Sequence, residues 1–241
     1  MMLIKVQNLS YKFHDFTALE NVSFVIEKGD IVAIIGPNGS GKTTLLQNII
    51  GVLSPTQGSI TIDGKKPKDV RQKIGYVPQK FEFDRTIPIS VHEFMSLEKC
   101  GKKGHDEKNI IEALREVGLE DIEQKQLGHL SGGQFQRVMI ARALLHEKEI
   151  LIFDEPSTGI DIAGEKTIYD LIKKINEDRG TTCLIVSHEL NIVNKYTKSV
   201  ICLNKEMICF GAPEVVITPE TLQKLYGSGT GLFHAHDHHT S

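Results

Sequence analysis

A glycine-rich segment near the start of the chain has the residue types and spacing of a phosphate-binding loop. It fits the pattern G-x-x-x-x-G-K-[ST] and reads Gly36-Pro37-Asn38-Gly39-Ser40-Gly41-Lys42-Thr43-Thr44. Its glycines let backbone N–H groups turn toward phosphate oxygens, and a following helix adds the positive end of its dipole. We expect the Lys42 ammonium to contact the β- and γ-phosphates and the Thr43 hydroxyl to ligate Mg²⁺. The segment therefore predicts a site for ATP or a similar nucleotide.

Two carboxylates follow an apolar run later in the chain. The run is Ile150–Phe153, and Asp154 and Glu155 come directly after it. We expect Asp154 to hold Mg²⁺, usually through its water shell. Glu155 can reach an attacking water as general base, a role worth about 10²–10⁴-fold in rate. An acidic pair at a strand end is often only a solvated turn, but a phosphate loop in the same chain favours the chemical role.

A second glycine motif, far along the chain from the first, reads Leu130-Ser131-Gly132-Gly133-Gln134. At a helix N-terminus, the Ser131 hydroxyl and the glycine amides would form another anion site. The simplest explanation for two phosphate-facing loops in one chain is a head-to-tail dimer. In such a dimer, each ATP lies between one copy's first loop and the other copy's second.

The elements that must position these motifs alternate between strands and helices. Ile31–Ile35 is a continuous apolar run, as expected for a strand buried on both faces, and it leads into the first loop. A helix should follow, with Leu45, Leu46 and Ile49 on its apolar face and Gly51 at its end. Alternation of this kind along the chain implies a mainly parallel sheet covered by helices.

The other expected elements are assigned from hydrophobic spacing. The segment from about 86 to 146 has the spacing of helices in an otherwise strand-rich chain, with one helix ending at Gly118 and another starting near Ser131. A further helix should have Ile168, Leu171, Ile172 and Ile175 on one face. The expected strands are 22–26, 59–62, 74–77, 150–153, 182–186 and a closing pair at 199–203 and 207–210.

Composition excludes few functions. The chain has 241 residues, of which 40% are hydrophobic and 24% charged, and its formal net charge is −3. This charge gives no general reason to expect nucleic acid or an anionic membrane as a partner. We see no signal peptide and no stretch near the roughly 20 apolar residues of a membrane helix. A role at a membrane would therefore require docking onto subunits that span the bilayer.

The cysteines show no pairing pattern in the sequence. They are scattered, without the CxxC spacing of a zinc or redox site, at positions Cys100, Cys183, Cys202 and Cys209. We expect four reduced thiols, as is usual in a reducing compartment.

These motifs, in this order, resemble the ATPases of ATP-binding cassette (ABC) transporters. The resemblance covers about residues 2–225 and implies an α/β fold with a P-loop NTPase (RecA-like) core. It also implies an N-terminal antiparallel β subdomain and an inserted α-helical subdomain at about 86–146. The ATP-binding domain would then occupy residues 1–225. Residues 226–241, rich in Gly, Ser, Thr and His, would form a flexible tail.

One expected contact with the base rests on this resemblance. Tyr11 matches the aromatic residue that stacks on adenine in the family. A lone tyrosine here would more often be an ordinary strand residue. Phe13 or Phe16 could stack on the base instead.

Three further site residues are implied by the family pattern. Gln79 matches the glutamine that senses Mg²⁺ and the γ-phosphate, and His188 matches the switch histidine that contacts the γ-phosphate and steadies the water. Asp161 matches the aspartate that faces the partner subunit. The chain departs from many members at Gly159-Ile160, where Ala-Leu is common, and at Glu189, where Asp is common. Neither departure removes a catalytic group.

The end of the chain suggests what is transported. The last eight residues contain four histidines, His234, His236, His238 and His239. Imidazoles at this density suit zinc and similar metals, and His-rich tails on such ATPases resemble those of zinc importers. The segment 76–91 also resembles the zinc and manganese importer branch. We expect zinc import, with manganese next, and a tail that either binds metal or is simply solvated.

The resemblance also implies partners and a location. It implies integral membrane permease subunits, a second copy of the chain and, indirectly, an extracytoplasmic metal-binding protein. The chain would lie at the cytoplasmic face of the cell membrane. Alternatives are a non-transport ATPase such as an iron–sulfur assembly ATPase, an importer of another substrate, or a metal-binding regulator. Intact Lys42, Glu155 and His188 argue against the regulator.

Overall fold

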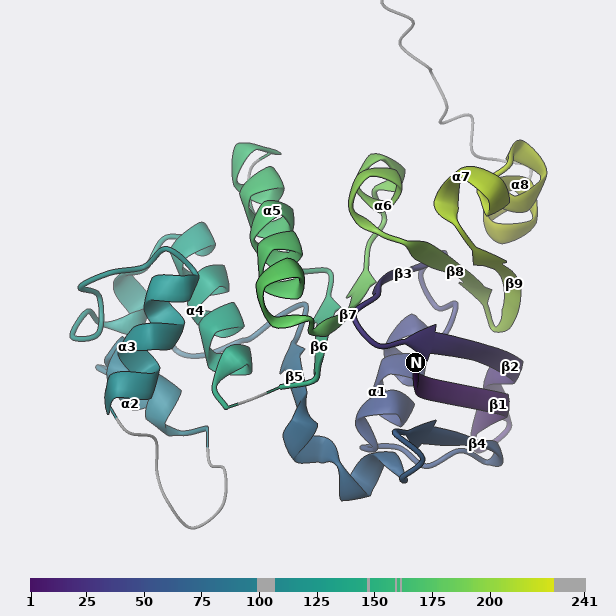
Figure 1. The fold of residues 1–241 in the computed structure, drawn as a ribbon, viewed down its shortest axis with the longest axis horizontal. Helices are drawn as coiled ribbons and strands as arrows, with labels where there is room; N and C mark the ends of the chain where they lie inside the picture. Colours follow the sequence, from purple (N-terminus) through teal and green to yellow (C-terminus); the bar gives the residue numbers. More distant parts are fainter. Residues whose placement is uncertain (99–106, 147, 159, 161, 228–241) are drawn as a thin grey trace, which may run out of the picture.

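The computed structural model describes residues 1–98, 107–146, 148–158, 160 and 162–227. Within these residues a larger sheet crosses the molecule, with a smaller sheet against part of one face and a group of helices at one end (Figure 1). None of the described helices is long and apolar enough to cross a membrane.

The larger sheet has six strands in the order β5-β6-β7-β3-β8-β9. Neighbouring strands from β5 to β8 are parallel, and β9 is antiparallel to β8. The parallel strands are short and almost wholly apolar, as expected for strands covered on both faces. The six strands of the larger sheet are β3 Ile31–Ile35, β5 Ile74–Val77, β6 Ile150–Asp154, β7 Thr182–Val186, β8 Ser199–Asn204 and β9 Glu206–Gly211.

The smaller sheet is antiparallel, with the order β2-β1-β4. Along β2, buried Val22, Phe24 and Ile26 alternate with less buried neighbours, as the sequence predicts for a half-buried strand. An Asp63–Gly64 turn with positive φ at both residues follows β4. The strands are β1 Met2–Phe13, β2 Phe16–Glu27 and β4 Gln57–Ile62.

Alternating side chains of β3 explain how the layers stack. Val32 and Ile34 pack in a buried cluster with helix α1 (Lys42–Ile50) and the antiparallel sheet. Ala33 and Ile35 face the other way, toward Val193 and Leu225 of two C-terminal helices. The period of two in a strand therefore places the smaller sheet and the C-terminal helices on opposite faces.

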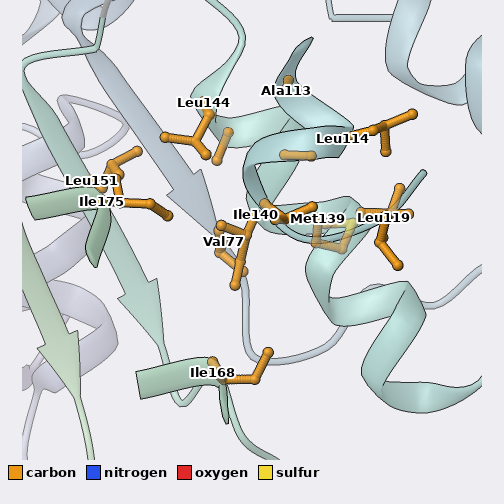
Figure 2. Packing of buried hydrophobic residues seen from close by; sticks show 14 of the residues in the cluster. Val77, Ala113, Leu114, Leu119, Met139, Ile140, Leu144, Leu151, Ile168 and Ile175 are labelled. Atoms are coloured by element: carbon orange, nitrogen blue, oxygen red, sulfur yellow. The ribbon is translucent and has the colours of Figure 1, made fainter. Parts of the chain in front are cut away.

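The remaining helices cover the face of the larger sheet opposite to α1, and α2, α3 and α4 form a group at one end of the molecule. Figure 2 shows side chains of this end group packing against Val77, Leu151 and the long helix α5. The segment 86–146, expected to be helical, contains α2, α3 and α4. The helices are α2 Val91–Ser96, α3 Glu107–Glu116, α4 Gly132–Leu144, α5 Ile162–Arg179, α6 Leu190–Tyr196, α7 Pro213–Val216 and α8 Pro219–Tyr226. Short 3₁₀ turns lie at Pro67–Asp69, Arg71–Lys73 and Leu127–His129.

Two expectations from the sequence need correction. Cys202 and Cys209 form a disulfide between β8 and β9, where the antiparallel register places them opposite each other with Cα atoms 4.8 Å apart. The expectation of four free thiols was therefore wrong. Among the described residues, Cys183 is a free thiol, and its burial raises its pKa to about 12. Tyr226, assigned to the tail, is instead the last residue of α8 and is half-buried.

Candidate functional site

The carboxyl ends of four neighbouring parallel strands bring the predicted motifs together. In the register of the sheet, Ile34 of β3 lies beside Val186 of β7, and Asp154 of β6 also lies beside Val186. Val77 of β5 lies beside Phe153 of β6. The loops that follow these strands therefore begin side by side, at the edge where open α/β sheets bind ligands.

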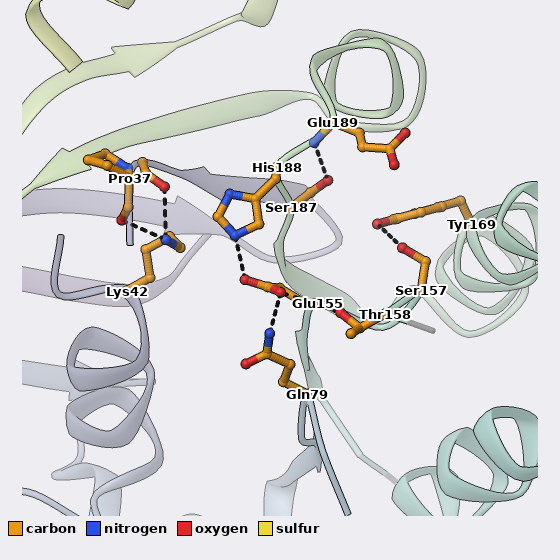
Figure 3. A network of polar contacts seen from close by, with 11 residues as sticks. Pro37, Lys42, Gln79, Glu155, Ser157, Thr158, Tyr169, Ser187, His188 and Glu189 are labelled. Atoms are coloured by element: carbon orange, nitrogen blue, oxygen red, sulfur yellow. Dashed lines mark hydrogen bonds and ion pairs between the residues drawn. The ribbon is translucent and has the colours of Figure 1, made fainter. Parts of the chain in front are cut away.

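The first glycine motif forms the predicted loop between β3 and α1. Its backbone is tight, because a Cβ on Gly41 (φ 97°) would lie 2.5 Å from the Ala18 carbonyl oxygen. Lys42 is buried, and its Nζ donates to the carbonyl oxygens of Gly36 at 2.8 Å and Pro37 at 3.0 Å (Figure 3). The lysine thus lies across its own loop, and its contact with the phosphates stays a prediction.

The charge of Lys42 is balanced against two carboxylates. Burial lowers its pKa, while the negative charges of Glu155 and Asp154 act in the opposite direction. The pKa of Asp154 is raised by burial and then by Glu155, against the opposing effects of the Tyr76 hydroxyl, Lys42 and the Thr43 hydroxyl. A buried carboxyl of this kind, next to a hydroxyl, has the oxygen ligands that suit a hard divalent cation.

Glu155 is the centre of the polar network at this edge. The Nε2 atom of His188 lies 2.5 Å from Glu155 Oε1, and the amide Nε2 of Gln79 hydrogen-bonds to Oε2 of the same carboxylate (Figure 3). The Glu155 N–H donates to the Val186 carbonyl oxygen at 3.2 Å. Its φ of 51° lies in the left-handed region, which is uncommon for a residue other than glycine and recurs at active sites. His188 and Gln79, which were predicted from separate segments, therefore both contact Glu155.

A cavity of about 430 Å³ opens beside the phosphate loop. Phe13 and Phe16 line it, together with residues 38–44, Gln79 and Glu155. Tyr11 does not line it: the ring of Tyr11 packs edge-on against Phe13, with centroids 4.7 Å apart, and contacts the core of the antiparallel sheet. The assignment of the base-stacking position to Tyr11 therefore stays a prediction, and Phe13 and Phe16, the alternatives named from the sequence, are the aromatic residues that line the cavity.

The second glycine motif lies at the start of α4, as predicted, and away from this cavity. Ser131 caps the helix, since its Oγ accepts the Gln134 N–H at 3.2 Å and its own N–H donates to Gln134 Oε1 at 3.1 Å. The amides of Gly132 and Gly133 belong to the first turn, where helices leave N–H groups free for other acceptors. None of residues 130–134 lines the cavity beside the phosphate loop. Within one chain the two glycine motifs are separate.

Some residues singled out from the sequence lie outside the described part. These are Cys100, Gly159, Asp161 and the tail residues His234, His236, His238 and His239.

The structure adds polar residues that the motifs do not include. A neighbouring cavity of about 280 Å³ is lined by Glu155 and His188 and also by Ser157, Tyr169 and Ser187. Figure 3 shows Ser157 and Tyr169 on the side of Glu155 away from Lys42. Buried Glu165 accepts from the Ser157 hydroxyl at 2.7 Å and extends the network into α5. No spacing rule marks Glu165, because its partners come from other segments.

Comparison with known proteins assigns the chain to a family. The ABC transporter family model matches residues 19–158, more than half of the chain. The chain belongs to the ABC transporter family. The α/β cassette fold and the ATPase class predicted from the two glycine motifs are thereby confirmed.

Similar ABC proteins match nearly the whole chain. A zinc import ATP-binding protein, ZnuC of Pseudomonas fluorescens, is 39% identical over 240 residues, covering 98% of this chain and 88% of that protein. A probable metal transport system ATP-binding protein of Thermotoga maritima is 38% identical over 227 residues, covering 94% and 91%. A solved dimeric ATP-binding cassette in a post-hydrolysis state with ADP and Pi is 32% identical, with a TM-score of 0.76 over 88% of this chain and 99% of that chain.

Proposed function

We propose that this ABC ATPase powers the import of a divalent metal ion, with zinc as the first candidate and manganese as the second. The observation that carries the proposal is the 39% identity to a zinc import ATP-binding protein over 98% of the chain. The similarity to a probable metal transport system ATP-binding protein of Thermotoga maritima points to the same substrate class.

The geometry supports different roles for Glu155 and Lys42 in ATP hydrolysis. The Glu155 carboxylate is held by His188 on one oxygen and by Gln79 on the other, so it has one fixed orientation toward the cavity. It is the group placed to accept a proton from a water attacking the γ-phosphate. Lys42 can turn from the Gly36 and Pro37 carbonyl oxygens to the phosphates, where its charge stabilises the transition state.

Mg²⁺ would be held by residues at the same edge of the sheet. The Thr43 hydroxyl opposes the rise in the pKa of the Asp154 carboxyl, and Gln79 is held close by through Glu155. These oxygen-bearing groups fit a magnesium ion that keeps some of its waters. When bound, Mg²⁺ neutralises charge on the β- and γ-phosphates.

The catalytic unit in this proposal is a head-to-tail dimer. The phosphate-loop cavity is open, and no residue of the Ser131–Gln134 motif lines it. The first N–H groups of that motif begin helix α4 and have no acceptor within the helix. A second copy can bring that motif over the nucleotide, with the loop at Asp161 facing the partner. The similar solved cassette in a post-hydrolysis state is itself dimeric.

A groove beside Gln79 is suited to a membrane subunit. Its volume is about 360 Å³, and its lining includes Phe81, Phe83, Phe135 and Gln79. The rings of Phe83 and Phe135 stack with centroids 5.4 Å apart, and Phe81 is 38% exposed. Exposed aromatic groups gathered in this way mark interaction sites. A permease docked here would lie next to the residue that holds Glu155, at the cytoplasmic face of the membrane.

The remaining parts of the proposal concern metal handling outside the ATPase site. The histidines of residues 234–239 have the donor type and density to bind zinc. They would serve as a sensor or buffer, because the ion itself crosses through the permease. An extracytoplasmic metal-binding protein would deliver the ion to that permease.

Metal uptake in cells tests the proposal. Cells lacking the chain should grow poorly in zinc-depleted medium and take up radioactive zinc slowly. Wild type should restore both, and Glu155→Gln should restore neither at equal expression. A variant ending at Gly227 separates the tail from the transport role, since it should still transport zinc. Normal zinc uptake in the deleted strain would overturn zinc import, and a defect confined to manganese would reassign the substrate.

A further inference from the structure

The loop that follows Glu155 begins at a strained backbone position. The φ of 51° at Glu155 is a sparsely populated conformation, which persists only where neighbouring groups hold it. The chain then turns at once: the Thr158 N–H donates to the Glu155 carbonyl oxygen at 3.2 Å, and the Ile160 N–H donates to the Ser157 carbonyl oxygen at 3.1 Å. The direction of the Glu155 side chain therefore depends on what holds this loop.

Ser157, in this loop, is held by two side chains of helix α5. Its hydroxyl donates to Glu165 Oε1 at 2.7 Å and lies 3.4 Å from the Tyr169 hydroxyl, a contact that Figure 3 shows. Glu165 and Tyr169 are four residues apart, so they lie on the same face of the helix. Both are buried. A hydrogen bond to a carboxylate away from bulk water is stronger than one between neutral groups.

Helix α5 is a firm support for Ser157, because it packs into the core of the molecule. Ile168 and Ile172 belong to the same buried cluster as Phe153 of β6. Glu155 comes two residues after Phe153. The strand that leads to the carboxylate and the helix that holds the loop after it are therefore parts of one packed unit.

The loop also reaches the carboxylate itself. The Thr158 hydroxyl donates to Glu155 Oε2 at 3.4 Å, the same oxygen that Gln79 contacts. Ser157 and Glu165 line the cavity of about 280 Å³ beside Glu155, and neither lines the cavity beside the phosphate loop. A shift of Ser157 should therefore move Thr158 and Glu155 and leave the phosphate loop in place.

We propose that Glu165 is a positioning residue for ATP hydrolysis, because its carboxylate, through the Ser157 hydroxyl, fixes the loop that orients Glu155. This role rests on the function of Glu155 as general base proposed above. Glu165 acts through Ser157 and Thr158 and is not itself a catalytic residue. Losing its contact should lower kcat, since Glu155 is then correctly oriented in fewer molecules. The KM for ATP should stay the same, because the phosphate loop is intact.

Ser157→Ala and Glu165→Leu are the direct test, because each breaks the contact from one side. In each variant kcat should fall about five- to twentyfold, near the lower end of the range for a hydrogen bond to a charged group, with the KM within about twofold of wild type. The double variant should lose little more than either single variant, because both remove the same contact. Glu165→Gln keeps an acceptor oxygen and should recover kcat to within about threefold of wild type.

Tyr196→Phe is the matched control, since it also removes a hydrogen bond to a carboxylate of α5. The Tyr196 hydroxyl donates to Asp170 Oδ1 at 2.7 Å, and neither residue lines the cavity beside Glu155. This variant should keep the wild-type kcat even where its melting temperature falls. An equal loss of kcat in Tyr196→Phe would show that the effect is general destabilisation and would overturn the proposal.

Two further outcomes would overturn the role of Glu165. One is an unchanged kcat in Ser157→Ala, and the other is a double variant whose loss of kcat is the product of the two single losses. Glu155→Gln in the same assay separates this role from that of the base. A normal kcat in Glu155→Gln would overturn the base role, whereas a slow Glu155→Gln beside a normal Ser157→Ala would overturn the role of Glu165 alone.

Discussion

His188 Nε2 lies 2.5 Å from Glu155 Oε1, and the two residues come from loops that follow adjacent strands, β7 and β6. Gln79, from the loop after β5, holds the other oxygen of the same carboxylate. Parallel register brings all three together without any contact from a second chain. The groups proposed to act in hydrolysis are therefore assembled within one copy, while closure over the nucleotide is the role proposed for the second.

Glu155→Gln should bind ATP and hydrolyse it very slowly. The amide is close in size to the carboxylate and can still bond to Gln79 or His188, but it cannot accept a proton from water. We expect kcat to fall by at least about 10²-fold, the lower range for loss of a general base. The KM for ATP should change little, and the variant should accumulate as an ATP-bound dimer in size-exclusion chromatography.

Glu149→Gln provides the control for this substitution. Glu149 is paired with Lys73, its Oε1 lying 2.5 Å from the lysine Nζ, and neither residue lines a cavity beside the phosphate loop. Its ATPase rate should match wild type. A near-normal rate in Glu155→Gln would remove Glu155 from the role of base.

Much of the site could be predicted because its residues are contiguous or tied to one element. The strand Ile31–Ile35, the loop and the helix at Lys42 are encoded in a single stretch, so spacing alone predicts their order. Ser131 is likewise recognisable as a helix cap from its own neighbours. Gln79 and His188 carry no such local signal, and their roles came only from resemblance to the family.

The features that sequence reasoning missed depend on contacts between distant segments. The pairing of Cys202 with Cys209 follows from the register of β8 on β9, and spacing along the chain gives no sign of it. Tyr226 is followed by a polar, glycine-rich segment, yet its ring is held by packing against the sheet. Tyr11 and Phe13 are two residues apart on β1, and only the folded structure shows that Tyr11 packs against the core while Phe13 lines the cavity.

Phe16 should contribute more than Tyr11 to the binding of the adenine base. Phe16 lines the cavity and is 53% exposed, whereas Tyr11 packs against the core. Stacking of a base on an aromatic ring is worth about 1–3 kcal/mol, so Phe16→Leu should raise the Kd for ATP about 5- to 150-fold. The fluorescence of a labelled ATP analogue measures this Kd.

Tyr11→Leu and Phe13→Leu complete that comparison. Leucine keeps an apolar group in the cluster around Tyr11, so the Tyr11 variant should retain the wild-type Kd within about twofold. The Phe13 variant reports whether the second ring lining the cavity shares the stacking. A large loss in Tyr11→Leu, with none in the two phenylalanine variants, would return the stacking role to Tyr11.

Mixed dimers can decide whether each ATP is shared between two copies. Lys42→Ala removes the phosphate contact of the first motif. Gly133→Asp puts a carboxylate in the second motif, and it should not disturb the chain, because an added Cβ there meets nothing within 4 Å. With Glu155→Gln in both copies to prevent turnover, the readout is the number of ATP molecules retained by each purified dimer.

The two arrangements of these substitutions give opposite results for shared and unshared sites. If ATP lies between the first motif of one copy and the second motif of the other, placing Lys42→Ala and Gly133→Asp in different copies damages one site twice and leaves the other intact. About one ATP per dimer should then be retained, against none when both substitutions are in the same copy. If each site belonged to a single chain, the order would reverse, since the unsubstituted copy would keep its own ATP. Retention only in the dimer that has both substitutions in one copy would therefore exclude the head-to-tail arrangement, whatever the transported ion.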